Sequence, residues 1–352
     1  MEKAYLILEN GRIFEGERFG ARSDAFGEIV FQTGMVGYLE ELTDPCYAGQ
    51  ILVNTFPLQG NYGAIAGDVS GKMVLSAFVA HDVCEQPSNF RADGTLSDLL
   101  EKHGIPGIKG VDTREITLIL RNEGTMKAMI ASEIPSDMSA FSGFAKENPV
   151  QKTGAVKTET LAQGENAKYT AALVNFGARP SFIEALHEKG FSVISVPYDA
   201  KAEEILSLNQ DAVILSDGPG DPMDNAHCIP EIRKLVGKTP IFAQGLGHLM
   251  LALSMGARTE KMLFGHRGAN QPVRDRKTGR TYITKQNHGY TVVPASLPAG
   301  AVMRLENAND HTCEGIDYEG ANAFSVQFRI DGLKGQIERD FFISHLIEIM
   351  GG

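Results

Sequence analysis

Short apolar runs separated by turn signals dominate the first part of the chain. The dipeptide Asn10-Gly11 is a typical two-residue hairpin turn between two such runs. The strand candidates in this part are residues 4–9, 12–14, 28–31 and 51–54. Apolar positions at helical spacing predict helices over residues 96–103 and 114–122, with Gly124 placed to end the second. We therefore expect a β-rich α/β domain over residues 1–144.

The pattern changes after a polar stretch. Between residues 145 and 168 the apolar content drops and Lys, Thr, Glu, Gln and Gly predominate, which indicates a linker. Beyond it, strand-like and helix-like segments alternate. The strand candidates are residues 171–176, 191–196, 212–215 and 240–243, and the helix candidates are residues 180–189, 202–208, 229–235 and 248–254. This alternation predicts a mostly parallel sheet covered by helices over residues 169–352.

Two glycine-rich loops follow strands of this predicted sheet, at residues 216–222 and 243–248. Sheets of this kind bind ligands at the carboxyl ends of their strands. The second loop joins a strand to a helix through a tight turn flanked by small residues, which is the geometry of a nucleophile elbow. An elbow presents one side chain beside the first backbone N–H groups of the helix, where an oxyanion can be stabilised.

The charge and composition of the chain exclude several classes of binding partner. Lys and Arg total 33 against 44 Asp and Glu, and the net charge of -11 disfavours binding to a nucleic-acid backbone. No apolar run reaches membrane-spanning length. The four cysteines are far apart, which favours reduced thiols in a cytoplasmic protein. Metal-ligand spacing is absent among His81, His103, His187, His227, His311 and His345. We therefore expect no nucleic acid, membrane or metal partner.

Motifs along nearly the whole chain resemble one family. Residues 242–249, Phe-Ala-Gln-Gly-Leu-Gly-His-Leu, resemble the F-G-I-C-L-G-H-Q elbow of class I glutamine amidotransferases. Other stretches of the second domain that resemble this class are residues 176–178, 215–222, 264–266 and 286–290. The amino-terminal stretches that resemble the carbamoyl-phosphate synthetase small subunit are residues 27–31, 37–38, 42–45, 60–63 and 111–114. The resemblance implies a flavodoxin-like amidotransferase domain after the small-subunit domain.

The resemblance also implies a partner. A large subunit would use ATP, Mg, bicarbonate and ammonia to make carbamoyl phosphate for arginine and pyrimidine synthesis, with no cofactor in this chain. In a competent small subunit a Cys attacks the carboxamide of glutamine and releases ammonia.

Three positions depart from the family where glutamine chemistry would be carried out. Gly245 occupies the position of the catalytic Cys. Arg329 stands where the family has its general-base His, and a guanidinium stays protonated at physiological pH. Asp331 keeps the carboxylate of the family's Glu without an imidazole to orient. Arg329 could instead form a surface ion pair with Asp331 or bind an anion.

The substrate pocket that the resemblance implies is altered as well. Leu249 stands where the family has a glutamine-contacting Gln, and Cys46 stands where it has a Ser. Other positions that match the family's pocket are Gly218, Gly220, Leu246, Asn287, Gly289 and Tyr290. His248, at the start of a helix, and His288, in an Asn-His-Gly turn, are expected to be structural hydrogen-bonding residues.

We therefore predict a small subunit that does not hydrolyse glutamine and that stabilises or regulates an ammonia-using large subunit. One alternative is a binding module for glutamine or a related small amino acid, built from the retained pocket. Another is a hydrolase with a relocated thiol, such as Cys228, although a buried, inert thiol is the simpler interpretation of that residue.

Overall fold

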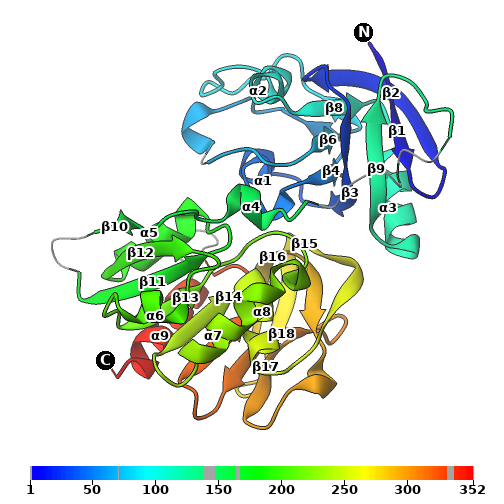
Figure 1. Ribbon diagram of the computed structural model, residues 1–352. Helices are drawn as coiled ribbons and strands as arrows, with labels where there is room; N and C mark the ends of the chain where they lie inside the picture. Colours follow the sequence, from blue (N-terminus) through cyan, green and yellow to red (C-terminus); the bar gives the residue numbers. More distant parts are fainter. Residues whose placement is uncertain are drawn as a thin grey trace. The chain divides into compact units, whose positions relative to one another are not determined.

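The computed structural model describes residues 2–69, 71–137, 141, 147–163, 167–330 and 337–351, and for residues 337–340 the backbone alone. The chain divides into two compact units, residues 1–149 and residues 150–352. Each unit has a sheet of its own (Figure 1). No helix in these described ranges has the length and apolar character needed to cross a membrane.

The first unit is built on a closed barrel with strand order β1-β2-β8-β6-β4-β3-β9 (Figure 1). Its strands are β1 (Lys3–Leu8), β2 (Ile13–Gly20), β3 (Ala25–Gln32), β4 (Gln50–Asn54), β6 (Ala77–Val79), β8 (Pro106–Lys109) and β9 (Met126–Ala131). Strands β1 and β2 pair antiparallel across the predicted Asn10-Gly11 turn, where Gly11 has a φ of 87°. The small strands β5 (Leu58–Gln59) and β7 (Asp82–Val83) pair with each other.

The α-helices in the described part of this unit are α1 (Tyr38–Leu42), α2 (Leu96–Lys102) and α3 (Thr113–Glu123). The α2 helix begins with a capping box between Thr95 and Asp98. The side chain of Asp112 caps α3, and Gly124 follows its last residue, as predicted. The β-rich α/β character expected of the amino-terminal part is confirmed.

The second unit contains a ten-stranded sheet in the order β10-β12-β11-β13-β14-β19-β18-β17-β15-β16. Strands β12, β11, β13, β14 and β19 run parallel to their neighbours in this series. The strands of this region are β10 (Glu159–Ala162), β11 (Tyr169–Asn175), β12 (Phe191–Pro197), β13 (Ala212–Leu215), β14 (Ile241–Gln244) and β19 (Ala323–Val326). The predicted mostly parallel sheet is therefore present.

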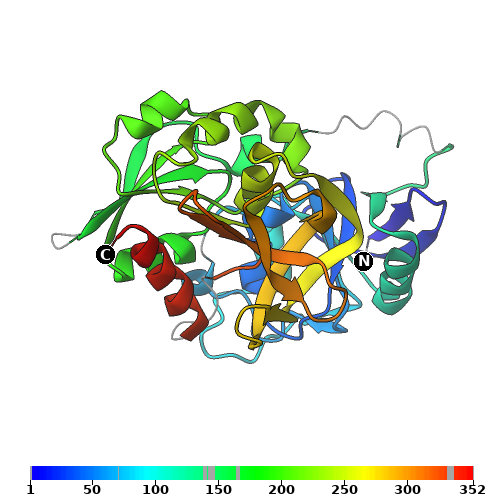
Figure 2. The same cartoon turned by 90° about the horizontal axis from the view of Figure 1, so that it is seen from below.

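Two hydrophobic cores cover the two faces of this sheet, because successive strand residues point to opposite faces. One core packs α6 (Ala202–Leu206), α7 (Ile229–Leu235) and α8 (Leu246–Ser254) on one face. The other packs α5 (Pro180–Glu188) and α9 (Ile337–Ile349) on the opposite face. Figure 2 shows α9, drawn in red, separated by the sheet from the green helices of the first core.

An antiparallel part of the sheet, formed by four of its ten strands, was not foreseen from the sequence. It consists of β15 (Thr259–Asp275), β16 (Thr281–Val292), β17 (Ala301–Asn307) and β18 (Cys313–Tyr318). His288 lies within β16, paired with His266 of β15, and not in a turn as expected. Within the range expected to be a linker, residues 150–153 form helix α4 (Val150–Thr153) and residues 159–162 form β10, which pairs antiparallel with β12.

Candidate functional site

The predicted elbow is present in the backbone. Strand β14 ends at Gln244, α8 begins at Leu246, and Gly245 between them has φ 57° and ψ -117°. These dihedral angles, with a positive φ, are ones that residues other than glycine adopt only under strain. A Cβ on Gly247 would lie 2.3 Å from the backbone oxygen of Leu215, so the tight contact of the helix with β13 requires a small residue there. The turn has therefore kept the form of a nucleophile elbow.

The space above Gly245 is filled by the side chain of Asp217. A Cβ added to Gly245 would lie 1.8 Å from Asp217 Oδ1 and 2.4 Å from Asp217 Cγ. The same Oδ1 accepts hydrogen bonds from the backbone N–H of Gly218, at 2.8 Å, and of Leu246, at 3.2 Å. Backbone N–H groups beside an elbow are the donors that would stabilise an oxyanion. Here they bind a carboxylate of the protein itself.

Two arginines lie on the other side of this carboxylate. Arg179 Nη1 lies 3.7 Å and Arg329 Nε lies 3.8 Å from Asp217 Oδ2. The side chains of Arg179, Asp217 and Arg329 are 12%, 9% and 7% exposed, so the group is nearly shielded from water. The expectation of a surface ion pair for Arg329 is wrong, because the residue is buried against Asp217. Asp331 lies outside the described residues.

No role was predicted for Asp217 or Arg179 from the sequence. Arg179 precedes α5, Asp217 follows β13 and Arg329 follows β19, so they meet because β11, β13, β14 and β19 are neighbours in the sheet. The available signal was weak: Asp217 lies within the first glycine-rich loop, and Arg329 stands in place of a base. Nothing in the local pattern around Arg179 indicated a functional position.

The other predicted pocket positions lie on several different elements. Gly218 and Leu246 adjoin the Asp217 carboxylate through their backbone N–H groups. The Leu246 and Leu249 side chains belong to the hydrophobic core that contains α8. Further along the second unit, Gly220 has a φ of 90°, and Asn287, Gly289 and Tyr290 lie on β16. Cys46 is buried in the short helix η1 (Pro45–Tyr47) of the first unit.

Two of the buried thiols, Cys228 and Cys313, are poor nucleophiles. Burial raises the pKa of Cys228 to about 12 and also raises the pKa of Cys313 to about 12. A thiolate is the reactive form of cysteine, so both side chains are held in the unreactive state at neutral pH. Cys228 packs within the core of the second unit.

His248 is structural, as expected. It is fully buried, its Nδ1 lies 2.7 Å from Ser325 Oγ, and burial lowers its pKa to about 3. The imidazole is therefore neutral at physiological pH. It anchors α8 to β19 and carries no charge that could assist a reaction.

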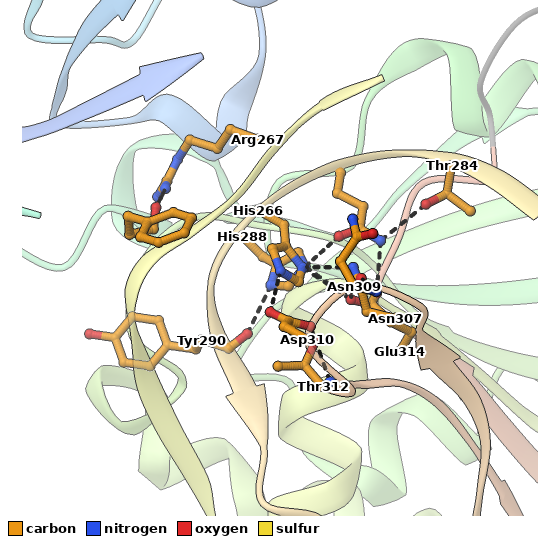
Figure 3. Close-up of polar contacts among 12 residues, drawn as sticks. His266, Arg267, Thr284, His288, Tyr290, Asn307, Asn309, Asp310, Thr312 and Glu314 are labelled. Carbon is orange, nitrogen blue, oxygen red and sulfur yellow. Dashed lines mark hydrogen bonds and ion pairs between the residues drawn. The ribbon is translucent and has the colours of Figure 1, made fainter. Parts of the chain in front are cut away.

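A separate buried polar cluster surrounds His266 and His288 (Figure 3). Burial would lower the pKa of His266, but hydrogen bonds to Asp310 and Glu314 outweigh it and raise this pKa to about 9. Burial lowers the pKa of His288 well below its usual value. Burial also raises the pKa of Glu314. Among the described residues, one group of three could hold a metal ion: His266, His288 and Glu314. Their wide separation in the sequence gave no signal of a metal site.

Comparison with known sequences defines first the class of protein. The profile of the carbamoyl-phosphate synthase small chain, CPSase domain, matches residues 6–130, and the profile of glutamine amidotransferase class-I matches residues 172–329. The chain thus combines a small-chain domain with a class I glutamine amidotransferase domain. The solved structure of a glutamine amidotransferase from Thermotoga maritima aligns with 52% of this chain and 83% of its own, at 18% identity and a TM-score of 0.38.

Full-length relatives identify the family. The carbamoyl phosphate synthase small chain of Clostridium perfringens is 41% identical over 350 residues, covering 98% of this chain and 99% of its own. That of Bacillus caldolyticus is 42% identical over 337 residues, covering 95% of this chain and 92% of its own. The chain belongs to the carbamoyl phosphate synthase small chain family.

Proposed function

We propose that this chain is a carbamoyl phosphate synthase small subunit that does not hydrolyse glutamine and acts as a structural or regulatory partner of an ammonia-using large subunit. The observation that carries the proposal is the Asp217 carboxylate, which fills the place of a nucleophile above Gly245 and binds the adjacent backbone N–H groups. The elbow is therefore closed by the chain's own side chain.

Amide hydrolysis through a covalent intermediate needs a nucleophile, a base to activate it and donors for the developing oxyanion. Gly245 supplies no nucleophile, and Arg329 supplies no base because its guanidinium stays protonated. The donors that remain, Gly218 N–H and Leu246 N–H, are engaged by Asp217. The site therefore lacks a nucleophile and a base, and its oxyanion donors are already occupied.

The size of the loss supports an inactive site. Removing the triad of a hydrolase costs about a million-fold in rate. The oxyanion donors and substrate binding by themselves leave roughly 10³- to 10⁴-fold acceleration over water. With the donors occupied as well, the site offers no useful supply of ammonia.

In this proposal the large subunit uses free ammonia, bicarbonate, ATP and Mg to form carbamoyl phosphate in the cytoplasm, for arginine or pyrimidine synthesis. The small chain itself would carry no cofactor. The family to which the chain belongs supports a large-subunit partner.

The alternatives receive less support from the geometry. A pocket for glutamine or a related amino acid would have to displace Asp217 from two hydrogen bonds and two arginines. A relocated thiol at Cys228 would have to ionise in a hydrophobic core. Calorimetry with glutamine tests the first alternative, and heat of stoichiometric binding would favour it over a closed site.

The test of the proposed function is a glutamate-release assay on the purified chain, alone and with its large subunit, beside a known glutaminase as positive control. We expect release at the level of the blank in both samples. Turnover above the blank that increases with the concentration of the chain would overturn the proposal.

A further inference from the structure

The second cluster in the amidotransferase domain brings three potential ligands together from three strands. His266 of β15, His288 of β16 and Glu314 of β18 point into one buried space (Figure 3), and their ligand atoms lie within 4.8 Å of one another. The two histidines are direct partners across the β15–β16 ladder. None of the three residues takes part in the site around Gly245.

The hydrogen bonds of Gln286 fix the orientation of its amide. Gln286 Nε2 lies 3.0 Å from Glu314 Oε2, and a carboxylate only accepts, so this atom is the amide nitrogen. It also donates to Thr284 Oγ1 at 3.0 Å, and that hydroxyl donates onward to the backbone oxygen of Gln271. The carbonyl oxygen of Gln286 must therefore face His288.

His288 is left with a lone pair aimed at oxygen atoms. Its Nδ1 lies 3.0 Å from the backbone carbonyl of Tyr290, an acceptor that is satisfied when Nδ1 carries the proton of a neutral ring. Its Nε2 then accepts, yet it lies 3.1 Å from Gln286 Oε1 and 3.9 Å from Glu314 Oε1. Three acceptors thus face one another, and only a proton or a metal cation can resolve their repulsion.

His266 also has a ring nitrogen that faces a carboxylate oxygen. Its Nε2 lies 2.8 Å from Asp310 Oδ2, which assigns the proton of a neutral ring to Nε2. Its Nδ1 lies 3.2 Å from Glu314 Oε1. Asn307 Nδ2 lies 3.4 Å from the same Nδ1 and 3.5 Å from the same Oε1, at the limit of hydrogen bonding. His266 Nδ1 and His288 Nε2 thus both face Glu314 Oε1, and the three side chains are 7%, 6% and 0% exposed.

We propose that this cluster is a structural zinc site, with His266 Nδ1, His288 Nε2 and Glu314 Oε1 as ligands and Gln286 Oε1 as the fourth. A tetrahedral zinc site with bonds of about 2.0–2.2 Å separates its ligand atoms by roughly 3.4 Å. The contacts of 3.1, 3.2 and 3.9 Å among these atoms lie close to that value. Two imidazoles with carboxylate and amide oxygens are a donor set that zinc accepts.

The outer contacts of the ligands are those of a metal site. His266 donates its other N–H to a carboxylate, His288 donates its other N–H to a backbone carbonyl, and Glu314 Oε2 accepts from Gln286. Such partners fix the tautomer and orientation of metal ligands. The ion would tie β18 to the β15–β16 hairpin within one domain.

The test uses the full-length chain, stripped with a chelator and then dialysed against zinc chloride. We expect about one zinc per chain by mass spectrometry of the metal, a higher unfolding temperature, and an intense tetrahedral absorption spectrum when cobalt replaces zinc. Less than stoichiometric zinc after dialysis, with an unchanged unfolding temperature, would overturn the proposal and leave protons as the occupants.

Three variants distinguish zinc bound at this site from zinc bound adventitiously elsewhere on the protein. Glu314→Gln removes a ligand and should abolish stoichiometric binding. Asp310→Asn alters an outer contact on a part-exposed side chain, so the protein should fold and bind zinc roughly 10- to 100-fold more weakly. The matched control His187→Asn, exposed on α5, should bind as wild type does. Equal zinc affinity in Asp310→Asn and wild type would refute the assignment.

Discussion

Restoring a side chain at Gly245 probes the closed elbow most sharply. In Gly245→Ala and Gly245→Cys the new Cβ would lie 1.8 Å from Asp217 Oδ1, so the carboxylate has to leave its position. It would lose hydrogen bonds from Gly218 and Leu246 and its place between Arg179 and Arg329. The alanine variant adds the Cβ alone, which separates the steric effect from that of the sulfur.

The magnitude follows from these contacts. Each hydrogen bond to a charged acceptor is worth about 1.5–3 kcal/mol, and the left-handed backbone costs a side chain about 1–3 kcal/mol. Rotation of Asp217 can recover part of this loss. We therefore expect either substitution to lower the free energy of unfolding of the second unit by about 4 kcal/mol, at the lower end of the combined range.

A double-mutant cycle measures the clash directly. Even the Cβ of Asp217 would lie 3.0 Å from the new atom, so Asp217→Gly and not Asp217→Ala is the relieving change. In the Asp217→Gly background, Gly245→Ala should cost at least about 2 kcal/mol less than it does in the wild type, as measured by urea denaturation. Equal costs in the two backgrounds would refute the reasoning. We expect no glutaminase activity in Gly245→Cys, because Arg329 still supplies no base.

Three further outcomes follow from the same structure. Asp217→Asn removes the negative charge between two buried arginines, and urea denaturation should show that the free energy of unfolding falls by about 3 kcal/mol. This is the low end for buried pairs, because Arg179 Nη1 and Arg329 Nε lie 3.7 and 3.8 Å from Asp217 Oδ2, beyond hydrogen-bond distance. An unchanged urea midpoint would contradict the ion pairs. Cys228, with a pKa of about 12, should resist iodoacetamide in the native protein, whereas the part-exposed Cys84 should react. Rapid labelling of native Cys228, detected by peptide mass spectrometry, would support the alternative of a hydrolase with a relocated thiol. His248 has a pKa of about 3 when folded and about 6.5 when unfolded, so the unfolded chain binds the extra proton between these values. Its contribution to stability is therefore complete above about pH 6.5 and is lost, at up to about 1.4 kcal/mol per pH unit, as the pH falls toward 3. The stability of His248→Asn should fall less steeply than that of wild type over this window, and parallel curves would show that His248 makes no such contribution.

Local patterns predicted the elements and the elbow well. The small residues around Gly245 and the alternation of strands and helices are local signals, and the structure has the elbow and a mostly parallel sheet where they indicate. His288 shows where local signals fail. Its Asn-His-Gly context favours a turn, but pairing along the β15–β16 ladder overrides that preference.

The contacts that decide the chemistry depend on strand order, which periodicity does not reveal. Arg179, Asp217 and Arg329 follow three different strands and meet at one edge of the sheet. His266 and Glu314 likewise come from strands that are not adjacent along the chain. A missing nucleophile could be read from Gly245 alone, but its replacement by an internal carboxylate required the assembled sheet.

The source of nitrogen in the assembled synthase decides whether the small chain delivers ammonia from glutamine. The complex of this chain with its large subunit would be given unlabelled ammonium together with glutamine carrying a heavy-isotope amide nitrogen, and the carbamoyl phosphate formed would be examined by mass spectrometry. We predict product that contains only nitrogen from ammonium, with no labelled fraction above the blank. Transfer of the heavy amide nitrogen into carbamoyl phosphate would contradict a closed, inactive elbow.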